Sequence, residues 1–184
     1  MRTKFDSNEE LYFSWYLEDL LAKRYIESCE KIEEPIEISK GLYKEYIKPM
    51  KKVPDKVVQQ TILKPSVYTP DFAITWTPKA LGIFVQKLSD DNKITCPFIC
   101  DDNLESIIEI KGGFDRGNMT RLVINNIKFI YDKYNTYINL IKIPDLFKKT
   151  FTPNRYFMTD KSFQPRKFNY KPKTIKEYVD YIKR

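Results

Sequence analysis

Histidine is absent from this chain of 184 residues, and glycine is scarce, with only five. The missing imidazole excludes Ser-His and Cys-His hydrolases, histidine-metal nucleases, histidine-based ribonucleases and zincins. Neither common glycine-rich phosphate loop follows a strand-like run, which argues against nucleotide triphosphate or dinucleotide binding. Carboxylates and lysine therefore remain as the available catalytic groups.

Long apolar runs are also missing. No stretch approaches the roughly 20 residues needed to span a bilayer, and the N-terminus leads into a charged amphipathic helix. We therefore expect an intracellular, cytoplasmic protein without a membrane partner.

Three cysteines, Cys29, Cys96 and Cys100, fit no zinc-site spacing and are expected to be buried free thiols. The length suits a single domain over residues 1–184.

The spacing of apolar residues predicts an α/β domain. Helices are expected at 7–24, 40–48, 118–134 and 174–182, the last capped by Thr174 and Glu177. Strands are expected at 57–63, 68–76, 81–86, 106–111 and 137–143. The stretch 77–105 is interpreted as an added hairpin or a substrate loop.

Two of the predicted strands carry acidic residues. Asp71 follows Pro70 inside one apolar run, and Glu109 and Lys111 lie two residues apart, and so on one face, in another. Mg2+ or Mn2+ typically binds one or two protein carboxylates and keeps several waters. A bound cation activates water and neutralises a phosphate, while a nearby ammonium orients the water. These residues therefore suit phosphodiester hydrolysis.

The pattern of Pro70, Asp71, Glu109 and Lys111 resembles the PD-(D/E)xK, or restriction-endonuclease-like, superfamily, and its small phage-type members in particular. The resemblance implies a restriction-endonuclease-like core, with a central mixed β-sheet flanked by helices. It also implies a Mg2+-dependent DNA endonuclease in a bacterial or phage-infected host cell, acting in phage or mobile-element DNA processing. Asp71 and Glu109 would hold the metal, and Lys111 would assist the water.

Other parts of the chain match fragments of the same pattern. Pro144-Asp145 follows a predicted strand, and Asp91-Asn92-Lys93 lies in a polar run that is typical of a turn. Pro54-Asp55 stays a competitor, because an extended run follows it.

Glu10 falls on the apolar stripe of the first predicted helix, with Phe13 and Leu17. In the small phage-type members, a Phe-Asp-Ser-x-x-Glu opening puts a helix-borne glutamate beside the metal, which implies that role for Glu10. A second interpretation stays open, because Ser7 and Glu10 also form a capping box.

Basic residues are concentrated near the C-terminus, where residues 148–184 hold eleven basic and three acidic groups. They alternate with aromatic residues, a mixture that can pair with phosphates and stack on bases. We therefore predict DNA contacts from Arg155, Arg166 and Lys167. The alternative is an aromatic tail packed over the core, with its charges in water.

Arg116, Asn118 and Arg121 follow Lys111 closely and precede or open a predicted helix. Forked guanidinium groups at a helix start favour an anion, so we predict that these three residues clamp a DNA phosphate. Alternatively, Asn118 only caps the helix and the arginines are solvated.

The substrate form stays open between duplex, single-stranded and branched DNA, and RNA. A junction resolvase would need two active sites and hence a homodimer. The alternative function is a nucleic-acid-binding or structural protein that keeps the nuclease fold without cleaving. The presence of both acidic residues and the lysine of the pattern argues against this alternative. A protein that only binds DNA gains little from two carboxylates close to the negatively charged backbone.

Overall fold

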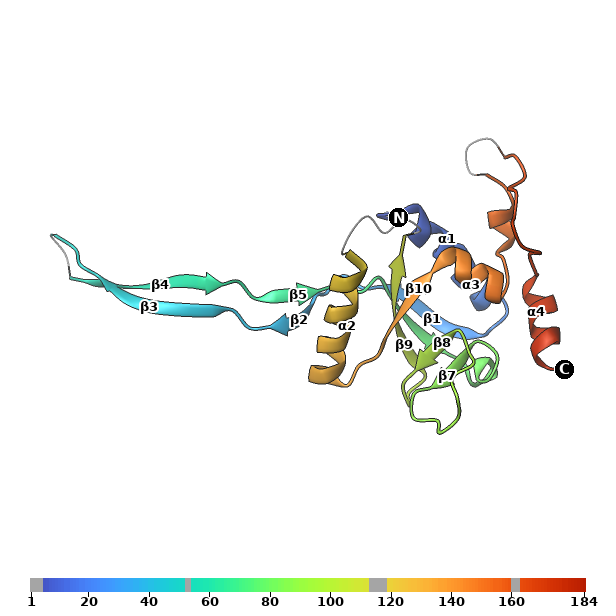
Figure 1. The fold of residues 1–184 in the computed structure, drawn as a ribbon, viewed down its shortest axis with the longest axis horizontal. Coiled ribbons are helices and arrows are strands. Elements are labelled where there is room, and N and C mark those ends of the chain that lie inside the picture. The colour runs from blue at the N-terminus through green and yellow to red at the C-terminus, as the bar shows by residue number, and fades with distance from the viewer. Residues whose placement is uncertain (1–4, 52–53, 113–118, 160–162) are drawn as a thin grey trace.

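A computed structural model describes residues 5–51, 54–112, 119–159 and 163–184 (Figure 1). Its centre is a mixed four-stranded sheet in the order β1-β6-β9-β10. The strands are β1 (Ile26–Lys31), β6 (Phe72–Trp76), β9 (Glu105–Lys111) and β10 (Ile138–Lys142). β6 pairs antiparallel with both β1 and β9, whereas β9 and β10 pair parallel. The described residues also form four α-helices, so the predicted α/β class with a mixed sheet is confirmed.

Alternation along the central strands separates a core face from a half-buried face. Phe72, Ile74 and Trp76 of β6 and Ile108 and Ile110 of β9 are buried. Because successive side chains in a strand point to opposite faces, Glu109 and Lys111 lie on the other face. Both are only partly buried.

Helix α1 (Asn8–Ala22) covers the core face of the sheet. Three of the four residues of its predicted apolar stripe are confirmed, since Phe13, Leu17 and Leu20 are each at most 2 % exposed, whereas the fourth, Leu21, is 37 % exposed. The Phe13 ring packs edge-on against Phe72 with centroids 5.4 Å apart. This packing fixes the first turn of α1 close to the start of β6.

Helix α2 (Met119–Tyr134) lies in the connection between the parallel strands β9 and β10, as the sequence predicts. Helix α3 (Ile143–Lys149) follows β10 directly and was not predicted. Pro144 stands in its first turn, where a missing N–H costs nothing. The Pro144-Asp145 pair therefore opens a helix and lies on no sheet strand.

The described residues of the stretch 36–68 form a long two-stranded ribbon, which we call the arm. Its strands are β2 (Ile36–Ser39), β3 (Leu42–Lys48), β4 (Lys56–Leu63) and β5 (Ser66–Tyr68). β2 pairs with β5 and β3 with β4, both antiparallel. Figure 1 shows the arm projecting past α2, away from the central sheet. The predicted strand 57–63 is confirmed, but the predicted helix 40–48 is wrong because this segment pairs with β4.

The stretch 77–105 belongs partly to the core. It contains a short 3-10 turn η1 (Pro78–Ala80) and two parallel strands, β7 (Val85–Lys87) and β8 (Phe98–Cys100). Phe84 and Phe98 are completely buried. The prediction of a strand at 81–86 is thus right only near its end, and the stretch is not a hairpin.

The C-terminal segment packs on α1 and ends in helix α4 (Ile175–Ile182). Phe151 stacks on Tyr16 at 4.3 Å, and the predicted capping box of Thr174 and Glu177 is present.

Cys29, Cys96 and Cys100 are free thiols as predicted, but only Cys100 is buried. Within the described part of the chain, no helix has both the length and the apolar character to cross a membrane.

Candidate active site

Strand pairing brings Asp71 to the last residues of β9. The Asp71 N–H donates to the Ile108 carbonyl at 3.0 Å, and the Ile110 N–H donates to Asp71 Oδ2 at 2.6 Å. Because β6 runs antiparallel to β9, the start of one strand meets the end of the other. Asp71 is therefore held beside Glu109 and Lys111, as the sequence predicts.

The two carboxyl groups are short of compensating charge. Burial raises the pKa of Asp71 to about 6. The hydrogen bond from the Ile110 N–H lowers this pKa, and the negative charge of Glu10 raises it. Burial, and then repulsion from Asp71, raise the pKa of Glu109 to about 7, while the Tyr68 hydroxyl as a donor and the Lys111 charge lower it. A pair of partly desolvated acids in mutual repulsion is a site that favours a cation.

Tyr68, at the end of β5, is a site residue that sequence reasoning did not select. Its hydroxyl is the only buried side-chain oxygen or nitrogen among the described residues that has no hydrogen-bond partner. Burial raises the pKa of this hydroxyl, and the adjacent Glu109 charge raises it further. The Tyr68 hydroxyl approaches the Glu109 carboxylate closely enough to lower the Glu109 pKa as a hydrogen-bond donor, although the contact does not meet strict hydrogen-bond geometry. Glu109 is therefore the group that this hydroxyl faces, and a water or ligand oxygen beside them would complete its hydrogen bonding.

Glu10 faces inward as predicted and is 6 % exposed. Lys31 Nζ lies 3.1 Å from its carboxylate and 2.8 Å from that of Asp6. The Ser7 hydroxyl accepts from the Glu10 N–H at 3.1 Å and donates to its carboxylate at 3.2 Å. The Ser7 half of the predicted capping box is therefore confirmed, while the Glu10 carboxylate accepts from the Ser7 hydroxyl and the Asp6 N–H. Glu10 also contributes negative charge to both Asp71 and Glu109.

A further acidic side chain lies where β9 ends. A Cβ built on Gly112 would stand 3.9 Å from Glu9 Oε1, so the Glu9 carboxylate is next to the strand exit. From helical spacing Glu9 is the poorer candidate, because it is rotated away from the apolar stripe. Helical spacing places Glu9 relative to α1 alone, whereas its distance to Gly112 depends on how α1 packs on the sheet.

The donor set fits a hard divalent cation in part. In residues 5–51, 54–112, 119–159 and 163–184, no three acidic or cysteine side chains are arranged to hold a metal ion. Asp71 and Glu109 nevertheless supply the one or two carboxylates that Mg2+ usually takes from a protein. The Tyr68 hydroxyl beside Glu109 is a further donor suited to a metal-bound water or a phosphate oxygen.

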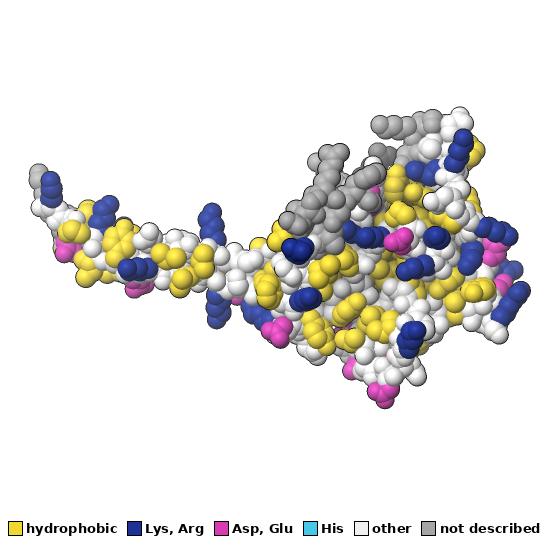
Figure 2. Space-filling view, in the orientation of Figure 1, with side chains coloured by type: hydrophobic (Ala, Val, Ile, Leu, Met, Phe, Trp, Pro, Cys, Tyr) yellow, Lys and Arg dark blue, Asp and Glu magenta, His cyan; other side chains and the backbone are white. Residues whose placement is uncertain are grey.

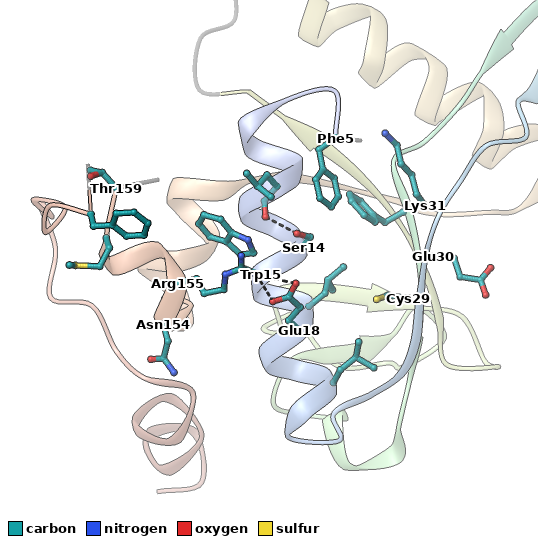
Figure 3. A pocket seen from close by; sticks show the side chains of 16 residues that line it. Phe5, Ser14, Trp15, Glu18, Cys29, Glu30, Lys31, Asn154, Arg155 and Thr159 are labelled. Carbon is teal, nitrogen blue, oxygen red and sulfur yellow. Dashed lines mark hydrogen bonds and ion pairs between the residues drawn. The ribbon is translucent and has the colours of Figure 1, made fainter. Parts of the chain in front are cut away.

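A groove of about 1130 Å³ begins beside this cluster. Figure 3 shows its lining on both sides of α1, with Phe5, Cys29 and Lys31 toward β1 and Arg155 and Thr159 on the C-terminal segment. Asp71, Glu109 and Lys111 do not line the groove. Its nearest link to the acidic cluster is Lys31, which lines the groove and pairs with Glu10.

The basic residues predicted to bind DNA have different surroundings. Arg155 pairs with Glu18 at 3.1 Å and stacks over Trp15. Arg166 donates to the Met158 carbonyl and stacks on two tyrosine rings, those of Tyr12 and Tyr156. These contacts match the packed-tail alternative. They leave the DNA-contact prediction for both arginines untested.

Lys167 and Arg121 are both exposed to solvent. Their predicted contacts with DNA stay predictions. Arg116 and Asn118, the other two members of the predicted phosphate clamp, lie outside the described residues.

Comparison of the chain with protein-family models, with curated proteins and with solved structures finds no match. The functional inference therefore depends on the residues of the site and on their geometry.

Proposed function

We propose that this chain is a Mg2+- or Mn2+-dependent DNA endonuclease built on a restriction-endonuclease-like core. The observation that carries the proposal is the meeting of Asp71, Glu109 and Lys111 at one end of the central sheet. The mixed sheet with helices packed on it supports the fold part of the proposal.

The residues have distinct roles in this proposal. Asp71 and Glu109 hold the cation, which when bound would neutralise phosphate charge and lower the pKa of a water molecule. Lys111, on the same strand face as Glu109, orients that water and adds positive charge near the phosphate. The Tyr68 hydroxyl donates to a phosphate or water oxygen, which satisfies its hydrogen-bonding capacity.

Glu10 and Lys31 support the site from its edge. Their ion pair sets the negative charge that Asp71 experiences. Movement of Lys31 toward a phosphate would release Glu10 toward the cation. We therefore propose that Glu10 is a third acidic group of the site, in addition to its capping contact with Ser7.

The test is a cleavage assay on supercoiled, single-stranded and branched DNA, each with Mg2+, Mn2+ or a chelator. We expect cleavage only with metal, and a loss of about 10²- to 10³-fold in rate for Asp71→Asn and for Lys111→Ala. Glu105→Gln is the matched control, because Glu105 lies exposed at the opposite end of β9. Binding to DNA without cleavage of any substrate would instead support the non-catalytic alternative.

Metal binding is measured separately from activity. Titration of Mn2+ into the protein by calorimetry is expected to give heat for the unaltered chain and for Glu105→Gln. The signal should be strongly reduced in Asp71→Asn and Glu109→Gln, since each removes one of the two proposed ligands. Equal Mn2+ affinity in all four proteins would contradict the assignment of the metal ligands.

A further inference from the structure

The outer strands of the arm, β3 and β4, are exposed at every residue except the half-buried Val58. Every side chain of β3 is exposed, and Ile47, Val57 and Leu63 are each more than 60 % exposed. Figure 2 shows apolar and basic side chains side by side along the arm. An isolated two-stranded ribbon is only marginally stable in water, so a ribbon of this length indicates an interaction surface.

The strand register divides the charges of the outer arm between two faces. Residues directly opposite each other share a face, and neighbours along a strand alternate. Tyr46 pairs with Val58, Lys44 with Gln60, and Lys48 with Lys56. One face, which we call the basic face, thus holds these six residues: Lys44, Tyr46, Lys48, Lys56, Val58 and Gln60.

The opposite face carries no lysine. It holds Tyr43, Glu45, Ile47, Val57, Gln59 and Thr61. The only acidic residue of β3 and β4 is therefore turned away from all three lysines of these strands. This separation of charge is what a ribbon needs when one face approaches a polyanion.

We propose that the basic face of the arm binds duplex DNA. The arm from 36 to 68 contains seven lysines and three acidic residues, a net charge of +4, which complements phosphate. A two-stranded β-ribbon fits the major groove, which is about 12 Å wide. The seven residues of β3 extend about 23 Å, enough to follow that groove across several base pairs.

The base of the arm ties this surface to the candidate active site. Tyr68, the last residue of β5, has its hydroxyl beside Glu109, and Asp71 follows three residues later. On the other strand, the Tyr134 hydroxyl of α2 donates to the Glu37 carbonyl at 2.8 Å, and Lys133 pairs with the Glu37 carboxylate. The arm that carries the basic face therefore starts beside Asp71 and Glu109, and a duplex held along the arm could extend toward them. In this respect the inference rests on the proposed nuclease function.

A second copy of the chain is the competing occupant. Two copies facing each other through the basic face would oppose lysines across a two-fold axis, which is unfavourable. The opposite face is more apolar, but its Glu45 would also meet its own copy near the axis. Charge complementarity thus favours DNA over self-association.

The test measures binding of a fluorescent 25-base-pair duplex by anisotropy, in chelator and at several salt concentrations. The variant Lys44→Ala/Lys48→Ala/Lys56→Ala removes the three basic-face lysines. We expect at least a 10-fold loss of affinity, and a decrease of roughly 2 to 3 in the slope of log affinity against log salt. Circular dichroism checks that the fold is kept.

Two controls make the result specific. Lys23→Ala/Lys93→Ala/Lys176→Ala removes the same charge from exposed positions off the arm, and Gln59→Ala/Thr61→Ala alters the opposite face. Both should keep affinity within about 2-fold. Equal weakening by the two triple variants would overturn the proposal, because it would show a general charge effect. A second result would also overturn it: the arm variant keeps its DNA affinity, while sedimentation shows that the unaltered protein is a dimer and the arm variant a monomer.

Failure of this inference is separable from failure of the nuclease proposal. Binding is measured in chelator, where no cleavage is expected. If the unaltered protein binds through the arm but cuts nothing with Mg2+ or Mn2+, only the nuclease proposal fails. If it cuts and the arm variant binds as well as the unaltered protein, only the arm inference fails.

Discussion

The end of the central sheet that holds Asp71 and Glu109 differs from the arm in how its charged groups are held. Asp71 and Glu109 are partly buried, and backbone hydrogen bonds from packed strands fix Asp71 in place. Lys44, Lys48 and Lys56 are exposed, on a ribbon whose outer half has no layer against it. Burial makes the carboxylates reactive toward a cation, whereas exposure leaves the lysines free to meet a large partner. Each region therefore suits one part of nuclease action.

The largest expected effect separates cutting from holding. Asp71→Asn should lower the cleavage rate by about 10²- to 10³-fold while keeping duplex affinity in chelator within about 2-fold. The triple arm variant should do the reverse, with weak binding but a near-normal rate at saturating DNA and Mg2+. The measurements are single-turnover cleavage and anisotropy on the same duplex. Loss of both properties in both variants would show that the two regions do not act separately.

A second contrast concerns stability. Phe13→Ala opens a cavity in the core and should lower the free energy of unfolding by about 3 to 5 kcal/mol. Ile47→Ala on the arm should lower it by less than about 1 kcal/mol, because Ile47 is 66 % exposed. Urea denaturation followed by circular dichroism gives both values. A large loss from Ile47→Ala would show that the arm is packed against something in solution.

The sequence predicts the two regions unequally, for a physical reason. Alternation within 106–111 correctly put Glu109 and Lys111 on one face, because that property is local to the strand. The placement of Asp71 follows once two apolar strands pair. Burial of Tyr68 and the position of Glu9 depend on how distant elements pack, so residue spacing carries no signal for them.

The arm was missed for a related reason. The segment 42–48 contains Leu42, Lys44 and Glu45, which favour helices, and Tyr43 and Ile47 are four residues apart. Local spacing therefore predicts a helix for this segment, but in the structure it pairs with residues 56–63 and forms a strand. The two-face charge pattern that distinguishes the arm appears only when that register is known.

The acidic pair also predicts a pH dependence that the arm should not share. A carboxyl group whose pKa is raised in the folded protein stabilises it below the unfolded pKa, and this stability is lost as pH rises through the folded pKa. For Glu109, whose pKa is raised from 4.5 to about 7, the window lies between these values. In chelator, the free energy of unfolding should fall by about 1 kcal/mol across it, after allowance for solvent screening.

Glu109→Gln tests this origin directly. The variant should be more stable than the unaltered protein at pH 8 in chelator and should show a weaker pH dependence. Adding Mn2+ at pH 8 should stabilise the unaltered protein and have little effect on the variant. Lys48→Ala, on the arm, should leave the pH profile unchanged. An identical pH profile for Glu109→Gln and the unaltered protein would show that Glu109 is not the group responsible.

The smallest effects distinguish the two roles of Glu10. Ser7→Ala removes the hydroxyl that caps α1 and should lower the free energy of unfolding by about 1 kcal/mol. The Lys31 contact still holds the Glu10 carboxylate in this variant, so the Mn2+ concentration needed for half-maximal cleavage should stay the same. Glu10→Gln removes the charge and should raise that concentration several-fold. If Glu10→Gln instead changes stability alone, as Ser7→Ala does, Glu10 is a helix cap and the cation is held by Asp71 and Glu109 without it.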